Sequence, residues 1–289
     1  MDIRLRIEQA LEAAVSAGET QEAPPGLAAA IRYAVFPAGH RIRPRILLGV
    51  AAACGDDAPE VSDAAAAAIE LLHCASLAHD DLPAFDGAST RRGKPSLHRA
   101  YGEPLAVLTG DALIVMAFET LARGASGRPE RLGPLVAAVG RAVGTPGGIC
   151  AGQAWEGEAK VDLSAYQRAK TGALFAGAAA AGAIAAGRVG EPWMAFGNGL
   201  GEAYQVADDI CDLIADPEVI GKPVGQDQAH ARPNAARELG LEGAKKRLAT
   251  LMRRAVESIP DCPGRDGLCA MVMAEGGKIL PKGAVRHAA

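Results

Sequence analysis

Small apolar residues dominate the long stretches of this chain that carry no turn signal. Residues 171–187 read TGALFAGAAAAGAIAAG, and other alanine-rich runs recur along the chain. Alanine has the highest helix propensity and a weak preference for strands. Aromatic residues make up only 4% of the 289 residues, so the core must be built from helices that approach one another closely. The pattern predicts an all-helical fold.

Apolar residues at three- and four-residue spacing, or alanine-rich runs, mark about ten helices. We expect them near residues 3–17, 26–35, 44–54, 61–81, 103–123, 133–143, 163–187, 197–215, 235–258 and 266–275. No sustained run of alternating β-branched residues and no hairpin pattern is present, so we expect no strands. Without a linker or a fixed-period repeat, residues 1–289 are predicted to form a single domain.

Charge and cysteine content exclude several classes of protein. With 30 basic and 34 acidic side chains the net charge is −4, which gives no overall attraction for nucleic acid. The six cysteines form no C-x-x-C pair, and MDIRLRIEQALEAAV lacks the apolar core of a signal peptide. We therefore expect reduced thiols and a cytoplasmic protein. The longest uncharged run, residues 171–187, is shorter than the roughly 20 residues that span a bilayer, so no membrane span is expected.

Two aspartate clusters lie in or beside apolar helices. In the first, HCASLAHDDLPAFD, Asp80 and Asp86 would lie about 240° apart on an unbroken helix. Pro83 interrupts the helix and can bring Asp86 back beside Asp80, while His73 lies two turns before Asp80 on the same face. In the second cluster, YQVADDICD, Gln205, Asp208 and Asp212 are expected to form one polar stripe of a continuous helix.

Adjacent aspartates usually mark a solvated surface or a helix cap. Here both clusters sit in strongly apolar helices, where unpaired carboxylates would be costly. Grouped carboxylates repel one another unless a cation joins them, and Mg²⁺ prefers such oxygen ligands. The histidines and cysteines are not arranged for zinc. Basic stretches that could equally be surface charge occur at 41–43, 91–94, 170 and 222–232.

Carboxylates that hold Mg²⁺ beside basic loops form a receptor for a diphosphate, because the metal bridges carboxylate and phosphate oxygens. The chain has no G-x-x-x-x-G-K-[ST] P-loop and no dinucleotide-binding fingerprint, so a nucleotide is not the expected carrier. A G-x-S-x-G nucleophile motif is also missing. The sequence therefore indicates metal-assisted departure of diphosphate.

These motifs resemble those of the trans-isoprenyl diphosphate synthases. DDLPAFD followed by RRGKPSLH is similar to the first aspartate-rich motif in its bacterial form, and QVADDICD is similar to the second. AGHRIRP, AKTGALF and GKPVGQD follow the family's order and approximate spacing, over roughly residues 30–235. The chain looks most like the short geranylgeranyl diphosphate synthases of bacterial carotenoid pathways.

The resemblance implies an all-helical bundle with a central cavity, a homodimer, and three Mg²⁺ ions that serve condensation of isopentenyl diphosphate with an allylic diphosphate. By this resemblance the metals would be held by Asp80, Asp86 and Asp208, with Asp81, Asp209 and Asp212 in support. The allylic diphosphate would be bound by Arg91, Lys170, Thr171, Gln205, Lys222 and Arg232. Isopentenyl diphosphate would be bound by His40, Arg43, His73 and Arg92. Lys170 and Thr171 would also stabilise the carbocation.

Several positions depart from the family pattern, among them Arg232, where lysine is common. His40 stands where the family usually has lysine, and it gives a shorter and weaker contact with a diphosphate. Glu156 occupies a place where aspartate is usual.

The resemblance also assigns product length to Ala75, five residues before the first motif, and its neighbour Ser76. These residues would form the floor of the pocket that holds the growing prenyl chain. An aromatic residue there would stop chain growth early, whereas alanine leaves room for a C20 product. Alternatively, Ala75 is one more small packing residue.

Three other activities stay open: a farnesyl diphosphate synthase, a terpene cyclase, and a non-catalytic prenyltransferase subunit.

Overall fold

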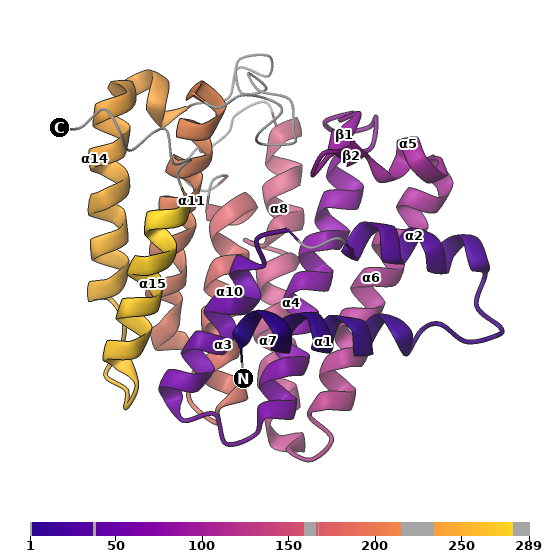
Figure 1. The fold of residues 1–289 in the computed structure, drawn as a ribbon, viewed down its shortest axis with the longest axis horizontal. Helices are drawn as coiled ribbons and strands as arrows, with labels where there is room; N and C mark the ends of the chain where they lie inside the picture. Colours follow the sequence, from indigo (N-terminus) through magenta and orange to yellow (C-terminus); the bar gives the residue numbers. More distant parts are fainter. Residues whose placement is uncertain (1, 37–38, 159–165, 167, 215–233, 280–289) are drawn as a thin grey trace.

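The protein is described by a computed structural model that covers residues 2–36, 39–158, 166, 168–214 and 234–279. Figure 1 shows long helices that run side by side, with α1 and α2 lying across them. The elements are α1 (Ile3–Ser16), α2 (Pro25–Val35), α3 (Ile42–Cys54), α4 (Pro59–Asp80), β1 (Thr90–Arg91), β2 (Lys94–Pro95), α5 (Leu97–Tyr101), α6 (Glu103–Gly124), α7 (Pro129–Val143), α8 (Ile149–Ala154), η1 (Trp155–Gly157), η2 (Arg168–Gly172), α10 (Ala173–Ala185), η3 (Glu191–Trp193), α11 (Met194–Ile214), α14 (Ala235–Glu257) and α15 (Arg265–Ile279). The all-helical prediction is confirmed.

Helix α10 joins the two halves of the apolar core. Its Leu174 belongs to a buried cluster that also draws on α1, α4, α6 and α7. The neighbouring Phe175 belongs to a second cluster with α3, α11, α14 and α15. A helix that is packed on several sides must be apolar all round, which explains the sequence of alanines and glycines in this stretch. The candidate site lies where the ends of α4, α10 and α11 meet.

The expectation of no strands is wrong for one short segment. Strands β1 and β2 pair antiparallel, Thr90 with Pro95 and Arg91 with Lys94. The two residues between them, Arg92 and Gly93, have φ of 54° and 74°, as the favoured two-residue hairpin turn requires. Two-residue strands carry too little alternation to be recognised by pattern. Helices α5 and α8 were also not predicted, and they are only five and six residues long.

Two of the described helices are long and apolar enough to cross a membrane by length and composition alone. They are α4 and α6, and not the uncharged run considered from the sequence. In α4, 78% of the apolar window is buried inside the protein, whereas in α6 the share is 44%. Helix α4 is therefore a core helix, and α6 presents part of its apolar surface to the outside.

Candidate functional site

The first aspartate motif forms a compact turn at the end of α4. The helix ends at Asp80, and the backbone N–H of Asp86 donates to the Asp80 carbonyl oxygen at 3.0 Å. Pro83 lies inside this turn, where its ring prevents the helix from continuing. The predicted return of Asp86 to the side of Asp80 is confirmed.

The Asp80 carboxylate lies in a partly buried, charged environment. Lys170 Nζ is 3.7 Å from its Oδ1, and this oxygen is buried without a hydrogen-bond donor. Burial raises the pKa of the Asp80 carboxyl, Lys170 opposes the rise, and the neighbouring Asp86 adds to it. A nearby cation stabilises the ionised form of such a buried carboxylate.

Lys170 lies on η2, a π-helical turn that leads into α10. Helix α8 approaches the backbone of this turn at Gly152. A Cβ atom on Gly152 would lie 2.4 Å from the backbone nitrogen of Lys170. This close approach brings Glu156 to the lysine, and the Lys170 ammonium donates to Glu156 Oε1. Tyr166 donates to the same oxygen at 2.7 Å. In this structure Lys170 is thus shared between Glu156 and Asp80.

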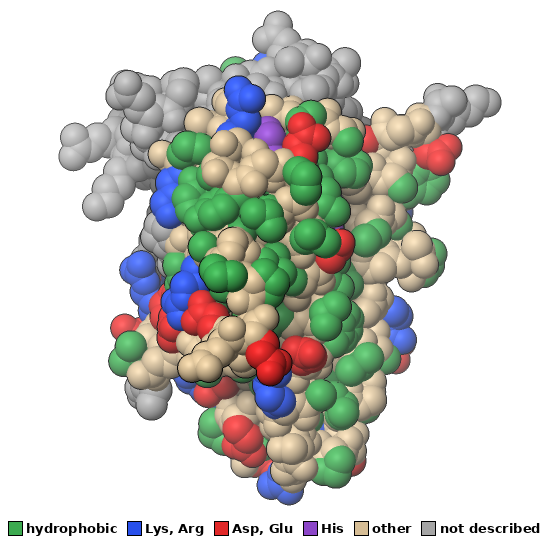
Figure 2. All heavy atoms as spheres, turned by 90° about the vertical axis from the view of Figure 1, so that its right-hand side faces the viewer, with side chains coloured by type: hydrophobic (Ala, Val, Ile, Leu, Met, Phe, Trp, Pro, Cys, Tyr) green, Lys and Arg blue, Asp and Glu red, His purple; other side chains and the backbone are tan. Residues whose placement is uncertain are grey.

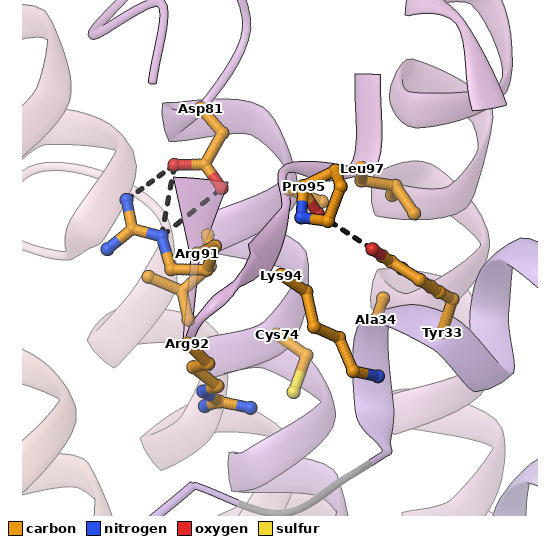
Figure 3. Close-up of a pocket in the computed structure, with 11 residues that line it drawn as sticks. Tyr33, Ala34, Cys74, Asp81, Arg91, Arg92, Lys94, Pro95 and Leu97 are labelled. Carbon is orange, nitrogen blue, oxygen red and sulfur yellow. Dashed lines mark hydrogen bonds and ion pairs between the residues drawn. The ribbon is translucent and has the colours of Figure 1, made fainter. Parts of the chain in front are cut away.

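The hairpin positions the predicted diphosphate-binding arginines (Figure 3). Arg91 Nε donates to Asp81 at 3.0 Å and 3.2 Å, and Nη2 donates to the same carboxylate. Asp81 is buried, with 2% of its surface exposed. The second aspartate of the motif therefore orients Arg91 through a bidentate ion pair, as a supporting residue would.

The two adjacent aspartates of α11 have different environments. Asp208 is exposed, whereas Asp209 is buried and accepts hydrogen bonds from Gln205 Nε2 at 3.0 Å and the Ala235 backbone at 2.8 Å. Gln205 in turn accepts from Thr171 Oγ1 at 2.8 Å. Gln205, Asp208 and Asp212, predicted to form one polar stripe, lie on the continuous helix α11, where the Gln205 amide donates to Asp209. Asp209 thereby ties α11 to the start of α14 and to Thr171.

Two of the predicted isopentenyl diphosphate residues, Arg43 and His73, meet beside this helix. Arg43 Nη1 lies 3.2 Å from His73 Nε2, and its guanidinium stacks over the Phe175 ring at 4.6 Å. Burial lowers the pKa of Arg43, while the charges of Glu70 and Asp208 oppose this effect. Burial and the surrounding arginines lower the pKa of His73 well below its usual value. His73 is therefore neutral at pH 7, and the positive charge comes from the arginines.

The carboxylates of the two motifs suit Mg²⁺ in chemistry, since they are hard oxygen donors and one buried oxygen of Asp80 has no hydrogen-bond donor. Among the described residues, however, no three His, Cys, Asp or Glu side chains lie close enough to hold one ion. Mg²⁺ usually takes one or two carboxylates and completes its shell with water and substrate phosphates. The donor set fits an ion that arrives together with a diphosphate.

The remaining predicted residues are placed as follows. His40 is exposed just before α3. Lys222 and Arg232 lie outside the described residues. Ala75 is 1% exposed within the apolar cluster of α4, α6 and α10, and Ser76 donates to the His73 carbonyl at 2.8 Å.

Sequence reasoning missed two buried charged residues, Arg41 and Glu70. Arg41 stood within a recognised basic stretch but received no role, and Glu70 was not singled out. Their side chains form an ion pair at 2.8 Å across 29 residues of sequence. No local pattern signals such a pairing, although a single glutamate in the middle of an alanine-rich apolar helix is itself a hint.

Comparison with known proteins places this geometry in a family. Residues 24–263 match the polyprenyl synthetase family. The chain belongs to this family. Among its relatives, the geranylgeranyl diphosphate synthase of Cereibacter sphaeroides is 59% identical over 281 residues, which is 97% of this chain and 98% of the relative. The farnesyl diphosphate synthase of Geobacillus stearothermophilus is 40% identical, with 84% and 85% covered.

Solved structures of this polyprenyl synthetase fold agree with the arrangement of helices. A geranyltransferase from Helicobacter pylori, solved with magnesium and isoprenyl diphosphate, gives a TM-score of 0.82 at 28% identity and covers 96% of each chain. The fold class and the family recognised from the sequence are both confirmed.

Proposed function

We propose that this protein condenses isopentenyl diphosphate with an allylic diphosphate and releases geranylgeranyl diphosphate as its main product. The observation that carries the proposal is the group formed by the Asp80–Asp86 turn, Lys170 and the Asp81-bound Arg91. Carboxylates for metal and cations for phosphate lie side by side there, as loss of a diphosphate requires. The product length follows the Cereibacter relative, which shares 59% of aligned residues.

The allylic half of the site would stabilise the leaving diphosphate. Asp80, Asp86 and Asp208 are the proposed ligands of three Mg²⁺ ions, which supply Lewis-acid stabilisation of the departing charge when bound. Arg91, oriented by Asp81, adds positive charge without a need to reorganise, and Lys170 adds a second positive charge. When a diphosphate binds, Lys170 is expected to exchange its contact with Asp80 for a phosphate oxygen. Gln205 and Thr171 stay linked to the buried Asp209 and keep this wall in place.

The other half would hold isopentenyl diphosphate by Arg43 and Arg92, with neutral His73 as a hydrogen-bonding partner. Phe175 and the apolar helices keep water from the allylic cation, which the isopentenyl double bond attacks. The proton released at the end passes to the diphosphate, the strongest base formed in the reaction.

The test is a product assay with purified protein, Mg²⁺, isopentenyl diphosphate and either farnesyl or dimethylallyl diphosphate. A C20 diphosphate is expected from both starters, and chelation of the metal should abolish turnover. A C15 product that is not extended further would indicate a farnesyl diphosphate synthase. A cyclised hydrocarbon would indicate a terpene cyclase, and inactivity without a second protein would indicate a subunit.

The exposed apolar side of α6 supports a homodimer as the working form. Leu108 and Val115 lie two turns apart on this helix and are 52% and 58% exposed. Figure 2 shows hydrophobic side chains gathered on the face of the molecule that carries α6. Apolar patches of this kind on a soluble protein typically mark a contact with another protein.

The six free cysteines support the proposed cytoplasmic location without a disulfide.

Charged residues on this face should separate the subunits. We expect the Leu108→Glu/Val115→Glu variant to shift from dimer to monomer in light scattering, because burial of two carboxylates at an apolar contact is costly. Val189→Glu is the matched control, since Val189 is 72% exposed in a different part of the fold. A monomeric parent protein, or a variant that stays dimeric, would refute the assignment of α6.

A further inference from the structure

A buried carboxylate lies among the arginines of the candidate site. Glu70 is 1% exposed on α4, ten residues before Asp80. Its Oε1 lies 2.8 Å from Arg41 Nη1 and 3.9 Å from Arg92 Nη2. Its charge also raises the pKa of Arg43 against the effect of burial. One carboxylate thus acts on three guanidinium groups that come from two separate segments of the chain.

Two of these arginines have a left-handed backbone conformation. Among the described residues, Arg41 and Arg92 are the two non-glycine residues with positive φ, at 52° and 54°. Such conformations are unfavourable for residues with a Cβ atom and persist where the surroundings impose them. Both side chains face the same oxygen of Glu70. The two segments with this backbone conformation thus meet at one carboxylate.

Arg41 is committed to structure and is not available to a substrate. It is 3% exposed, and its nitrogens donate to Glu70, to Glu8 and to the Val35 carbonyl. It is also the N-cap residue of α3, so it fixes where this helix begins. Arg43 follows two residues later, which means that the Arg41–Glu70 pair sets the position from which the Arg43 side chain reaches His73.

Arg92 is held from two sides but keeps an exposed edge. A Cβ atom on Gly39 would lie 2.9 Å from its Cζ, so the guanidinium packs directly against the glycine backbone. Glu70 Oε1 lies 3.9 Å from its Nη2. About a quarter of the Arg92 side chain, 26%, is still exposed and can meet a ligand. An arginine confined in this way loses little entropy when it binds a phosphate.

We propose that Glu70 is a positioning residue for the isopentenyl diphosphate site. It holds Arg92 directly, and through Arg41 it fixes the start of α3, which carries Arg43. This inference rests on the proposed function. Loss of the negative charge would also make the site more positive, which by itself favours a diphosphate. The loss of order wins, because Arg41 keeps Glu8 and the Val35 carbonyl but loses its buried charged partner, and the turn that carries it must shift to rehydrate the guanidinium.

The Glu70→Gln variant keeps the size of the side chain and removes its charge. We expect the KM for isopentenyl diphosphate to rise about tenfold, with the KM for the allylic diphosphate and kcat each changed less than about threefold. Glu70→Asp keeps the charge with a shorter reach and should give an intermediate KM. If the glutamine variant does not fold, the aspartate variant alone decides the matter by the same comparison of the two KM values.

Glu8→Gln is the matched control, because Glu8 shares Arg41 but has no contact with Arg92. It should lower the melting temperature without separating the two KM values. Equal changes in both KM values, an unchanged KM or a lower KM for isopentenyl diphosphate in the Glu70 variants would overturn the assignment. A parent protein that does not consume isopentenyl diphosphate would instead refute the proposed function.

Discussion

An Asp80→Asn variant should lose at least about a thousandfold in kcat, equivalent to roughly 4 kcal/mol of transition-state stabilisation. Asp80 is the one residue of the first motif whose carboxylate contacts Lys170 and has a buried oxygen without a hydrogen-bond donor. An amide keeps the shape but is a poor ligand for Mg²⁺. Steady-state kinetics over a range of Mg²⁺ concentrations should show weaker dependence on the metal as well as slower turnover.

The same variant should be as stable as the parent or more stable when no metal is present. The pKa of the Asp80 carboxyl is raised in the folded state, chiefly by burial, so its ionised form at neutral pH opposes folding. Asparagine removes that charge. Thermal unfolding in a chelator measures this, and Asp261→Asn, at an exposed position, serves as the control. Full activity in Asp80→Asn, or a large loss of stability that accounts for the lost activity, would contradict the metal-binding role.

Local sequence patterns were sufficient for the helices and for the first aspartate turn. The alanine-rich segment that became α4 needs no distant partner to be recognised as a helix, and Pro83 has the same effect on the backbone in any fold. The return of Asp86 to Asp80 follows from these two facts. For the same reason the ends of α4, predicted at 61 and 81, lie within two residues of the observed Pro59 and Asp80.

Contacts between distant segments were beyond the reach of these patterns. Glu70 meets Arg41 and Arg92 only because α4, the start of α3 and the hairpin are brought together by packing of the whole bundle. The different environments of Asp208 and Asp209 likewise depend on Ala235, which is 26 residues away from Asp209. The chemistry of the site is encoded locally, whereas the support of its side chains is encoded by the tertiary structure.

Substitution of Ala75 by tyrosine should change the main product from C20 to C15. Ala75 is 1% exposed and lies on α4 below the aspartate motif, within the apolar cluster that α6 and α10 complete. If the diphosphate is held at Asp80, as proposed, the growing prenyl chain extends along this helix into that cluster. A phenol ring at position 75 fills the space that the fourth isoprene unit needs. Chromatography of the dephosphorylated products measures the C15 to C20 ratio.

A control in the same helix separates a floor from general damage to the core. Ala68 is fully buried and lies two turns, or about 10.5 Å, farther from Asp80 than Ala75. Overpacking at either position should cost about 1–3 kcal/mol in stability. If Ala75 forms the floor of the pocket for the prenyl chain, only Ala75→Tyr shortens the product. A ring at position 68 lies beyond the point that the end of a C20 chain reaches. Equal product distributions in both variants would mean that Ala75 serves only to pack α4 against its neighbours.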